Sequence, residues 1–226
     1  MELNVKLFAD GADKDGMLEM YANPIISGFT TNPTLMKAAG IKDYKSFALD
    51  ILSFIKDKSI SFEVFSDEFD EMKRQALDIA SWSENIYVKI PITNTKSESS
   101  AELIDRLSTN NIKVNVTAMM SAQQCFLAAM AGATWVSIFG GRVNNMGYNS
   151  CGEIARLRKL LDQFELPAKI IVGSTREILN ITEWLEAGAH IVTVTPSLLE
   201  GMIVHPYSKE TVQMFLHDAA KVNKIA

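Results

Sequence analysis

The stretch Ile86-Tyr87-Val88-Lys89-Ile90-Pro91 places one lysine among aliphatic, aromatic and prolyl neighbours. Runs of β-branched and aromatic residues that end at a proline are typical of a strand covered on both faces. We therefore expect Lys89 to lie inside the fold, where loss of hydration disfavours the charged amine and favours a nucleophile at neutral pH. The alternative is a wet strand end, at which Lys89 reaches solvent or pairs with a carboxylate.

Other short apolar runs have the same character and alternate along the chain with longer segments of helical period. The expected strands are residues 5–8, 28–30, 59–64, 86–90, 113–116, 135–139, 169–172 and 191–194. The expected helices include residues 44–56, 69–82, 97–107, 121–131, 151–164 and 177–187. Gly132 and Gly188 each follow one of these helices and are suited to left-handed caps.

The alternation of strands and helices predicts an α/β fold with parallel strands, because parallel neighbours need crossover connections. Eight such units in 226 residues match a closed, eight-stranded (β/α)8 TIM barrel better than an open sheet. No linker divides the sequence, so we expect residues 1–226 to form a single domain. That domain includes an extra C-terminal helix from about residue 209, whose apolar face could pack on its own barrel.

Composition excludes several classes of partner. The chain is 47% hydrophobic and carries a net charge of −5, which gives no electrostatic reason to bind nucleic acid or an anionic membrane. The start Met1-Glu2-Leu3-Asn4 has no basic segment before an apolar run, so we expect a cytoplasmic protein. Cys125 and Cys151 show neither metal spacing nor a disulfide framework, and no nucleotide-binding glycine motif occurs. We therefore expect no metal and no cofactor.

A (β/α)8 barrel carries its chemistry at the carboxyl ends of its strands. Seven consecutive expected strands deliver polar or aromatic side chains there: Asp10, Thr31, Asn32, Glu63, Lys89, Asn115, Thr117, Ser137, Phe139, Arg142, Ser174 and Arg176. A single polar strand residue is more often a core hydrogen-bonder than a catalytic group. Seven strands that bring such residues to one rim indicate a shared pocket.

The residue types in this pocket suggest carbonyl chemistry on an amine. A carbinolamine on Lys89 must exchange protons, and Glu63 with the Thr117 hydroxyl could hold a water for that exchange. Asp10 is a second candidate base, able to move the proton of an aldol hydroxyl. The alternative for Asp10 is that it merely caps the next helix.

Two glycine-containing clusters suggest a phosphate site at the same rim. Gly140-Gly141-Arg142 and Gly173-Ser174-Thr175-Arg176 each combine exposed backbone N–H groups with a guanidinium. Either cluster alone is a weak signal, because Arg176 could simply pair with Glu177 or Glu183.

The motifs that carry a family resemblance are Thr30-Thr31-Asn32-Pro33-Thr34, Phe62-Glu63-Val64, Val88-Lys89-Ile90-Pro91, Asn115-Val116-Thr117, Ala131-Gly132-Ala133, Phe139-Gly140-Gly141-Arg142 and Ser174-Thr175-Arg176. In order and approximate spacing they resemble the transaldolase family, in its short, single-domain, fructose-6-phosphate aldolase-like branch. The resemblance implies that Lys89 forms a Schiff base with a ketose phosphate, such as fructose 6-phosphate or sedoheptulose 7-phosphate. A dihydroxyacetone unit would then pass to an aldose phosphate.

The same resemblance implies roles for the other residues. Asp10 would transfer protons, and Glu63 with Thr117 would position the catalytic water. The residues implied around the substrate are Thr31, Asn32, Asn115, Ser137 and Phe139 for the sugar, and Arg142, Ser174 and Arg176 for its phosphate. The resemblance also implies carbohydrate metabolism in the non-oxidative pentose phosphate pathway, and a homo-oligomer, a pentamer or decamer, with the C-terminal helix against a neighbour.

Two positions discriminate within the family. Glu63 and Phe139 resemble transaldolases, whereas the aldolase branch is expected to have glutamine and tyrosine there. A phenyl ring keeps its side of the pocket dry and lets a bound carbanion wait for an acceptor. Departures from the family pattern are Gly11, where a hydroxyl residue usually follows the aspartate, and Ile138 and Gly140 in the sixth strand and loop.

Alternative functions remain open at the level of sequence. One is a fructose-6-phosphate aldolase-type lyase that releases free dihydroxyacetone. The others are a sugar-phosphate isomerase or different barrel lyase, and a non-catalytic sugar-phosphate-binding barrel. The last two groups need no nucleophilic amine, so the chemistry of Lys89 separates them from the aldol reaction.

Overall fold

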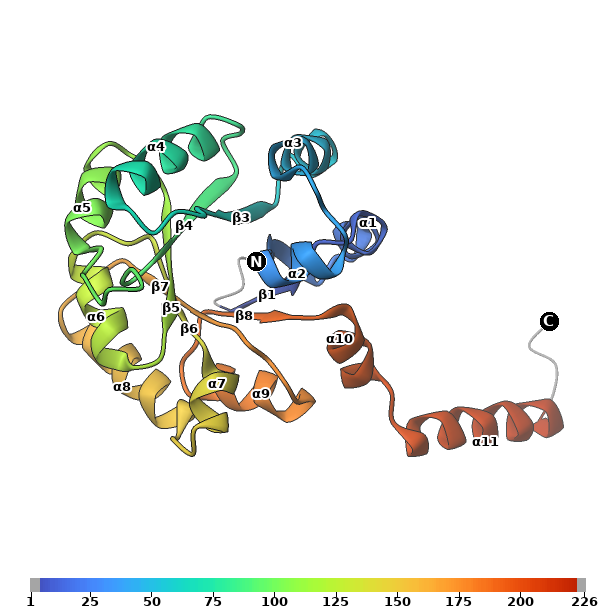
Figure 1. Ribbon diagram of the computed structural model, residues 1–226. Coiled ribbons are helices and arrows are strands. Elements are labelled where there is room, and N and C mark those ends of the chain that lie inside the picture. Colours follow the sequence, from blue (N-terminus) through green and yellow to red (C-terminus); the bar gives the residue numbers. More distant parts are fainter. Residues whose placement is uncertain (1–4, 223–226) are drawn as a thin grey trace.

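The computed structural model describes residues 5–222, in which eight parallel strands close into a barrel in sequence order (Figure 1). The strands are β1 (Lys6–Asp10), β2 (Ile26–Thr30), β3 (Ser59–Glu63), β4 (Ile86–Pro91), β5 (Val114–Met119), β6 (Trp135–Ile138), β7 (Lys169–Val172) and β8 (Ile191–Val194). The expected (β/α)8 fold is confirmed. The opening residues 1–4, used above for the cytoplasmic expectation, lie outside the described residues.

Helices follow the strands in turn, and all but the last of them surround the barrel (Figure 1). They are α1 (Lys14–Ala22), α2 (Pro33–Ala38), α3 (Tyr44–Phe54), α4 (Phe69–Ala80), α5 (Ala101–Thr109), α6 (Ala122–Met130), α7 (Gly140–Asn145), α8 (Ser150–Gln163), α9 (Ile178–Glu186), α10 (Pro196–Ile203) and α11 (Pro206–Val222). The left-handed caps are confirmed, with φ of 91° at Gly132 and 104° at Gly188.

The sequence missed or misplaced several helical boundaries. Four helices, α1, α2, α7 and α10, were not predicted. The helix expected from residue 97 begins only at Ala101, because Ser97 has a left-handed φ of 64° and Thr93 pairs with Ser99 in an isolated bridge. Short helices give too few turns to display an amphipathic period, so pattern reasoning does not find them.

Strand register decides which side chains point into the barrel. Glu63 lies beside Lys89, and Lys89 lies beside Asn115 in the parallel ladders of β3, β4 and β5. Because successive side chains of a strand alternate between faces, residues in register share a face. These three side chains therefore point to the same side of the sheet, which is the interior.

An apolar cluster fills the barrel interior near the amino ends of the strands. Phe8, Tyr87, Trp135, Ile171 and Ile191 pack together, and the rings of Tyr87 and Trp135 stack with centroids 3.4 Å apart. Gly28 allows Phe8 to approach, since an added Cβ would lie 2.6 Å from the phenyl ring. Each member of the cluster stands two residues before an inward position nearer the carboxyl end, so the cluster fills the interior at the amino ends of the strands and the later positions face the carboxyl end.

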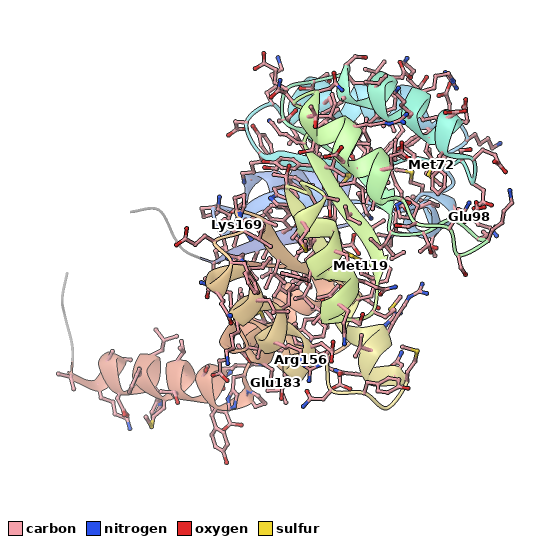
Figure 2. The ribbon with its side chains drawn as sticks, turned by 90° about the vertical axis from the view of Figure 1, so that its left-hand side faces the viewer. Met72, Glu98, Met119, Arg156, Lys169 and Glu183 are labelled. Carbon is pink, nitrogen blue, oxygen red and sulfur yellow. The ribbon has the colours of Figure 1, made fainter. Side chains whose placement is uncertain are left out.

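The last helix differs from the others. The α11 helix buries none of its side chains and lies clear of the barrel in Figure 1 and Figure 2. The expectation that it packs on its own barrel is therefore wrong, and the helix begins at Pro206 instead of about residue 209. Between residues 5 and 222, no helix is both long and apolar enough to cross a membrane.

Candidate active site

A cavity of about 360 Å³ opens at the carboxyl ends of the strands. Its lining includes every expected site residue except Thr31: Asp10, Asn32, Glu63, Lys89, Asn115, Thr117, Ser137, Phe139, Arg142, Ser174 and Arg176. Figure 2 shows the two ends of the barrel through Lys169, at the start of β7, and Glu98, in the loop that follows β4. The cavity belongs to the end marked by Glu98, because the loops after the strands lie there.

Lys89 lies within this cavity and is nearly inaccessible, with 6% of its surface exposed. Its Nζ donates a hydrogen bond to the Thr31 carbonyl oxygen at 2.9 Å and lies 3.2 Å from Glu63 Oε2. The expected burial is confirmed and the wet strand end is excluded, but the amine does pair with a carboxylate. A carboxylate this close to the amine is placed to take part in the proton transfers that carbonyl chemistry on an amine requires.

Thr31 and Asn32 connect β2 to the site in different ways. The Thr31 side chain is fully buried outside the cavity lining, so its backbone carbonyl, instead of its hydroxyl, reaches Lys89. Asn32 Oδ1 accepts a hydrogen bond from the Leu35 backbone N–H at 3.0 Å and thereby caps α2. The capping role leaves the amide Nδ2 of Asn32 available to a ligand in the cavity.

Asn115 is fixed by hydrogen bonds on both sides. Ser137 Oγ donates to Asn115 Oδ1 at 2.6 Å, and Asn115 Nδ2 donates to Ser61 Oγ at 3.1 Å. These two bonds set which end of the amide is the acceptor. The Thr117 hydroxyl is buried and has no hydrogen-bond partner among the described residues, so it is free to bind a ligand or water.

Asp10 is the last residue of β1, whereas the sequence placed it just after that strand. Thr30 Oγ1 donates to Asp10 Oδ1 at 2.8 Å. Asp13 caps α1 by accepting from the Gly16 N–H, so the capping alternative for Asp10 is excluded. Burial raises the pKa of the Asp10 carboxyl above its ordinary value, although the charge of Lys89 and the Thr30 hydrogen bond act in the opposite direction.

The far rim of the cavity carries two guanidinium groups. Within residues 5–222, neither Arg142 nor Arg176 forms a salt bridge, so the expected alternative pairing of Arg176 with Glu177 or Glu183 does not occur. The Arg142 guanidinium lies 5.5 Å from the centroid of the Phe139 ring. Both cations are therefore available to an anionic ligand.

The glycine clusters differ from expectation. Gly140 and Gly141 are buried at the start of α7, instead of presenting an exposed loop backbone. Gly141 is required there, because a Cβ would lie 1.8 Å from the Ser174 carbonyl oxygen. Ser174 itself has a left-handed φ of 61°, and its buried hydroxyl has no partner among the described residues. This close contact holds Ser174 and Arg176 next to Arg142.

Sequence reasoning missed Ser61, Thr193 and the side-chain role of Thr30. Ser61 stands two residues before Glu63 on β3, and Thr193 of β8 stands two residues before Thr195, which follows that strand. Thr193 and Thr195 both line the cavity. The signal available in the sequence was this alternation of polar residues within otherwise apolar strands. Over residues 5–222, no group of three or more histidine, cysteine or acidic side chains is placed to hold a metal ion.

Residues 7–225 match the model of the family described as Transaldolase/Fructose-6-phosphate aldolase. The chain belongs to this family. A probable transaldolase of Carboxydothermus hydrogenoformans is 37% identical over 214 residues, which cover 95% of this chain and 97% of that protein. A probable transaldolase 2 of Listeria monocytogenes is 35% identical over 95% of each chain. The protein is thus an enzyme of the transaldolase family, as the motifs implied.

A solved structure described as "Native KDPGal structure" shares the fold alone. It has a TM-score of 0.54 and 16% sequence identity, and the superposition covers 86% of this chain and 83% of that chain.

Proposed function

We propose that this protein is a class I transaldolase that moves a dihydroxyacetone unit from a ketose phosphate, such as fructose 6-phosphate or sedoheptulose 7-phosphate, to an aldose phosphate. The observation that carries the proposal is the buried Lys89 amine, 3.2 Å from Glu63 in a cavity that also holds Asp10. Family membership supports the same class of reaction.

In this proposal the Lys89 Nζ attacks the C2 carbonyl of the ketose, and loss of water from the carbinolamine gives the iminium. Glu63 and the Thr117 hydroxyl hold the water that moves protons during these steps. Asp10 accepts the proton of the C4 hydroxyl as the C3–C4 bond breaks, and the bond's electron pair enters the iminium to form an enamine. Attack of the enamine on the acceptor aldehyde, with the proton returned by Asp10, reverses the sequence.

The cavity supplies separate contacts for the two ends of the sugar. Asn32, Asn115 and Ser137 are proposed to hold the hydroxyls of the dihydroxyacetone unit next to Lys89. Arg142, Ser174 and Arg176 are proposed to hold the phosphate at the rim, since two unpaired guanidinium groups suit bidentate binding. Thr31 contributes through its carbonyl contact with Lys89.

Borohydride reduction in the presence of fructose 6-phosphate tests the amine directly. The native protein should gain a covalent hexose phosphate adduct, seen by mass spectrometry and mapped to Lys89. Lys89→Met should gain none and lose activity on the order of a thousand-fold or more. Lys169→Met, at the opposite end of the barrel, is the matched control and should behave as the native protein. Absence of an adduct on the native protein would favour an isomerase or a non-catalytic binder.

Phe139 favours transfer over the lyase alternative, because its phenyl ring, covered by Arg142, offers no hydroxyl to protonate the enamine. Without an aldose phosphate acceptor, free dihydroxyacetone should therefore be released from fructose 6-phosphate only slowly. With an acceptor present, the transfer product should dominate. Fast release without any acceptor would show that the protein is a lyase.

We further propose that the chain works as a single-domain subunit of a homo-oligomer, a pentamer or decamer, in which α11 packs on a neighbour. The exposed apolar side chains of α11 support this arrangement. The proposed setting is cytoplasmic carbohydrate metabolism in the non-oxidative pentose phosphate pathway, where ketose and aldose phosphates are both available.

A further inference from the structure

The surroundings of Asp10 depend on closure of the barrel. Asp10 ends β1, which pairs with β2 on one side and with β8 on the other. Thr30 of β2 donates its hydroxyl to Asp10 Oδ1 at 2.8 Å. Thr193 of β8 forms a hydrogen bond with the same Thr30 hydroxyl. Both threonines are buried, with 4% and 6% of their surfaces exposed, and both line the cavity beside Asp10.

The number of hydrogens available fixes which group donates in each hydrogen bond between Asp10, Thr30 and Thr193. An ionised carboxylate can only accept, so the single hydrogen of the Thr30 hydroxyl goes to Asp10. The hydrogen between the two threonines must then come from Thr193. When Asp10 is protonated, the row can reverse, with Asp10 donating to Thr30 and Thr30 donating to Thr193. The same heavy-atom positions therefore satisfy both protonation states of Asp10.

No neighbour in the sequence supplies this support. Gly11 follows Asp10 and has no side chain, and its backbone N–H donates to the Thr30 carbonyl oxygen at 3.1 Å. Thr193 is held in place in turn, because its carbonyl oxygen accepts from the Thr175 hydroxyl at 2.7 Å. The hydroxyl that steadies the Asp10 carboxylate comes from the adjacent strand, and its own partner comes from the last strand.

We propose that Thr193 is a positioning residue for Asp10, acting through Thr30 in a reversible relay of hydroxyl groups. The relay holds the carboxylate in one orientation while it takes up and returns a proton. The inference deepens the proposed function, because it rests on Asp10 as the group that transfers the proton. Hydrogen bonds in such a row reinforce one another, so loss of the Thr193 hydroxyl weakens the bond from Thr30 to ionised Asp10.

Thr193→Val removes the hydroxyl and keeps a β-branched side chain of the same shape. We expect kcat to fall about 10-fold with little change in KM, since one hydrogen bond to the proton-transfer group is weakened. We also expect the acid limb of the kcat profile to move to higher pH, because the ionised form of Asp10 loses support. Thr193→Ser should restore both the rate and the profile. Thr182→Val on the exposed side of α9 is the matched control and should change neither.

The outcomes separate this inference from the proposed function. Schiff-base trapping at Lys89 precedes the step at Asp10, so Thr193→Val should still form the borohydride adduct. A native pH profile and kcat in Thr193→Val, or an equal defect in Thr193→Ser, would overturn the relay while leaving trapping intact. Absence of an adduct on the native protein would overturn both proposals. If the valine variant does not fold, Thr193→Ala removes the same hydroxyl without placing a second methyl group against Thr30.

Discussion

His190 precedes β8 at the end of the barrel opposite the cavity, and its side chain takes part in pairing with β7. Its Nδ1 accepts a hydrogen bond from the Ile170 backbone N–H at 3.0 Å, which requires that nitrogen to be unprotonated. Burial, with smaller contributions from Arg158 and Lys169, lowers the pKa of His190 to about 4 from an ordinary value of 6.5. The folded protein therefore keeps this ring neutral in mildly acidic solution.

This shift predicts a pH dependence of stability. Between about pH 6.5 and pH 4 the unfolded chain binds a proton at His190 that the folded chain does not, so the free energy of unfolding falls as pH falls through this window. Above about pH 6.5, His190 does not change the pH dependence of the free energy of unfolding. His190→Asn keeps a hydrogen-bond acceptor for the Ile170 N–H but has no proton to bind. The fall in the free energy of unfolding across this window should therefore be smaller by about 1 kcal/mol, allowing for solvent screening. Urea unfolding across this pH range measures the difference.

His217→Asn on the exposed α11 is the control and should follow the native protein at every pH. A His190→Asn variant whose stability falls with pH as steeply as that of the native protein would contradict the assignment.

At the scale of elements, the contact between α7 and the loop after β7 shapes the rim of the cavity. Gly141 in the first turn of α7 leaves room for the Ser174 carbonyl oxygen, and an added Cβ would also come within 3.1 Å of Arg176 Cγ. Because the nearest atom belongs to the backbone, it cannot move aside as a flexible side chain would. The close contact between α7 and this loop therefore fixes how far apart they lie. It also fixes the positions of Ser174, Arg176 and Arg142 at the rim.

Gly141→Ala should push this loop away from α7. We expect a destabilisation of about 1–3 kcal/mol from overpacking, and a rise in KM for phosphorylated ketoses larger than the fall in kcat. Steady-state kinetics with thermal unfolding checks both. Gly152→Ala in α8 is the control, since its Cβ would make only an ordinary contact at 3.4 Å. An unchanged KM in Gly141→Ala would argue against a phosphate site between α7 and this loop.

At the scale of the whole molecule, α11 differs from the other helices described between residues 5 and 222, because it buries none of its side chains. Its apolar residues Phe215 and Leu216 are 61% and 67% exposed, and the helix stands away from the barrel in both views. Large exposed apolar surfaces of this kind mark interaction sites. A second copy of the chain is the partner that the proposed homo-oligomer provides.

Light scattering should therefore give a native mass that is a multiple of 25.0 kDa. Phe215→Glu with Leu216→Glu should reduce the mass and leave the circular dichroism of the barrel unchanged, because neither side chain packs on it. Gln213→Glu with His217→Glu adds the same charge to another face of α11 and should keep the native mass. A native protein of 25.0 kDa would remove the assembly proposal.

Much of the fold was predictable because strand and crossover patterns are local. The runs around Lys89, Trp135 and Ile191 each carry enough apolar residues to indicate a buried strand, and their alternation with helices indicates parallel pairing. The candidate site followed in outline, since the carboxyl ends of parallel strands meet at one rim. The short helix α7 was missed because Gly140 and Gly141 have low helix propensity and read as a loop.

The sequence by itself determined the eight-stranded α/β pattern and the family to which the chain belongs, whereas the burial of Lys89, which the sequence left open, was decided by the structure. Only the tertiary structure decided that Glu63 pairs with Lys89, that Thr31 acts through its carbonyl, and that Thr193 reaches Thr30 beside Asp10. Strand patterns are set by neighbouring residues, whereas these contacts join residues far apart in the chain. They exist because closing the barrel pairs the first strand with the last and fixes the register of every strand between them.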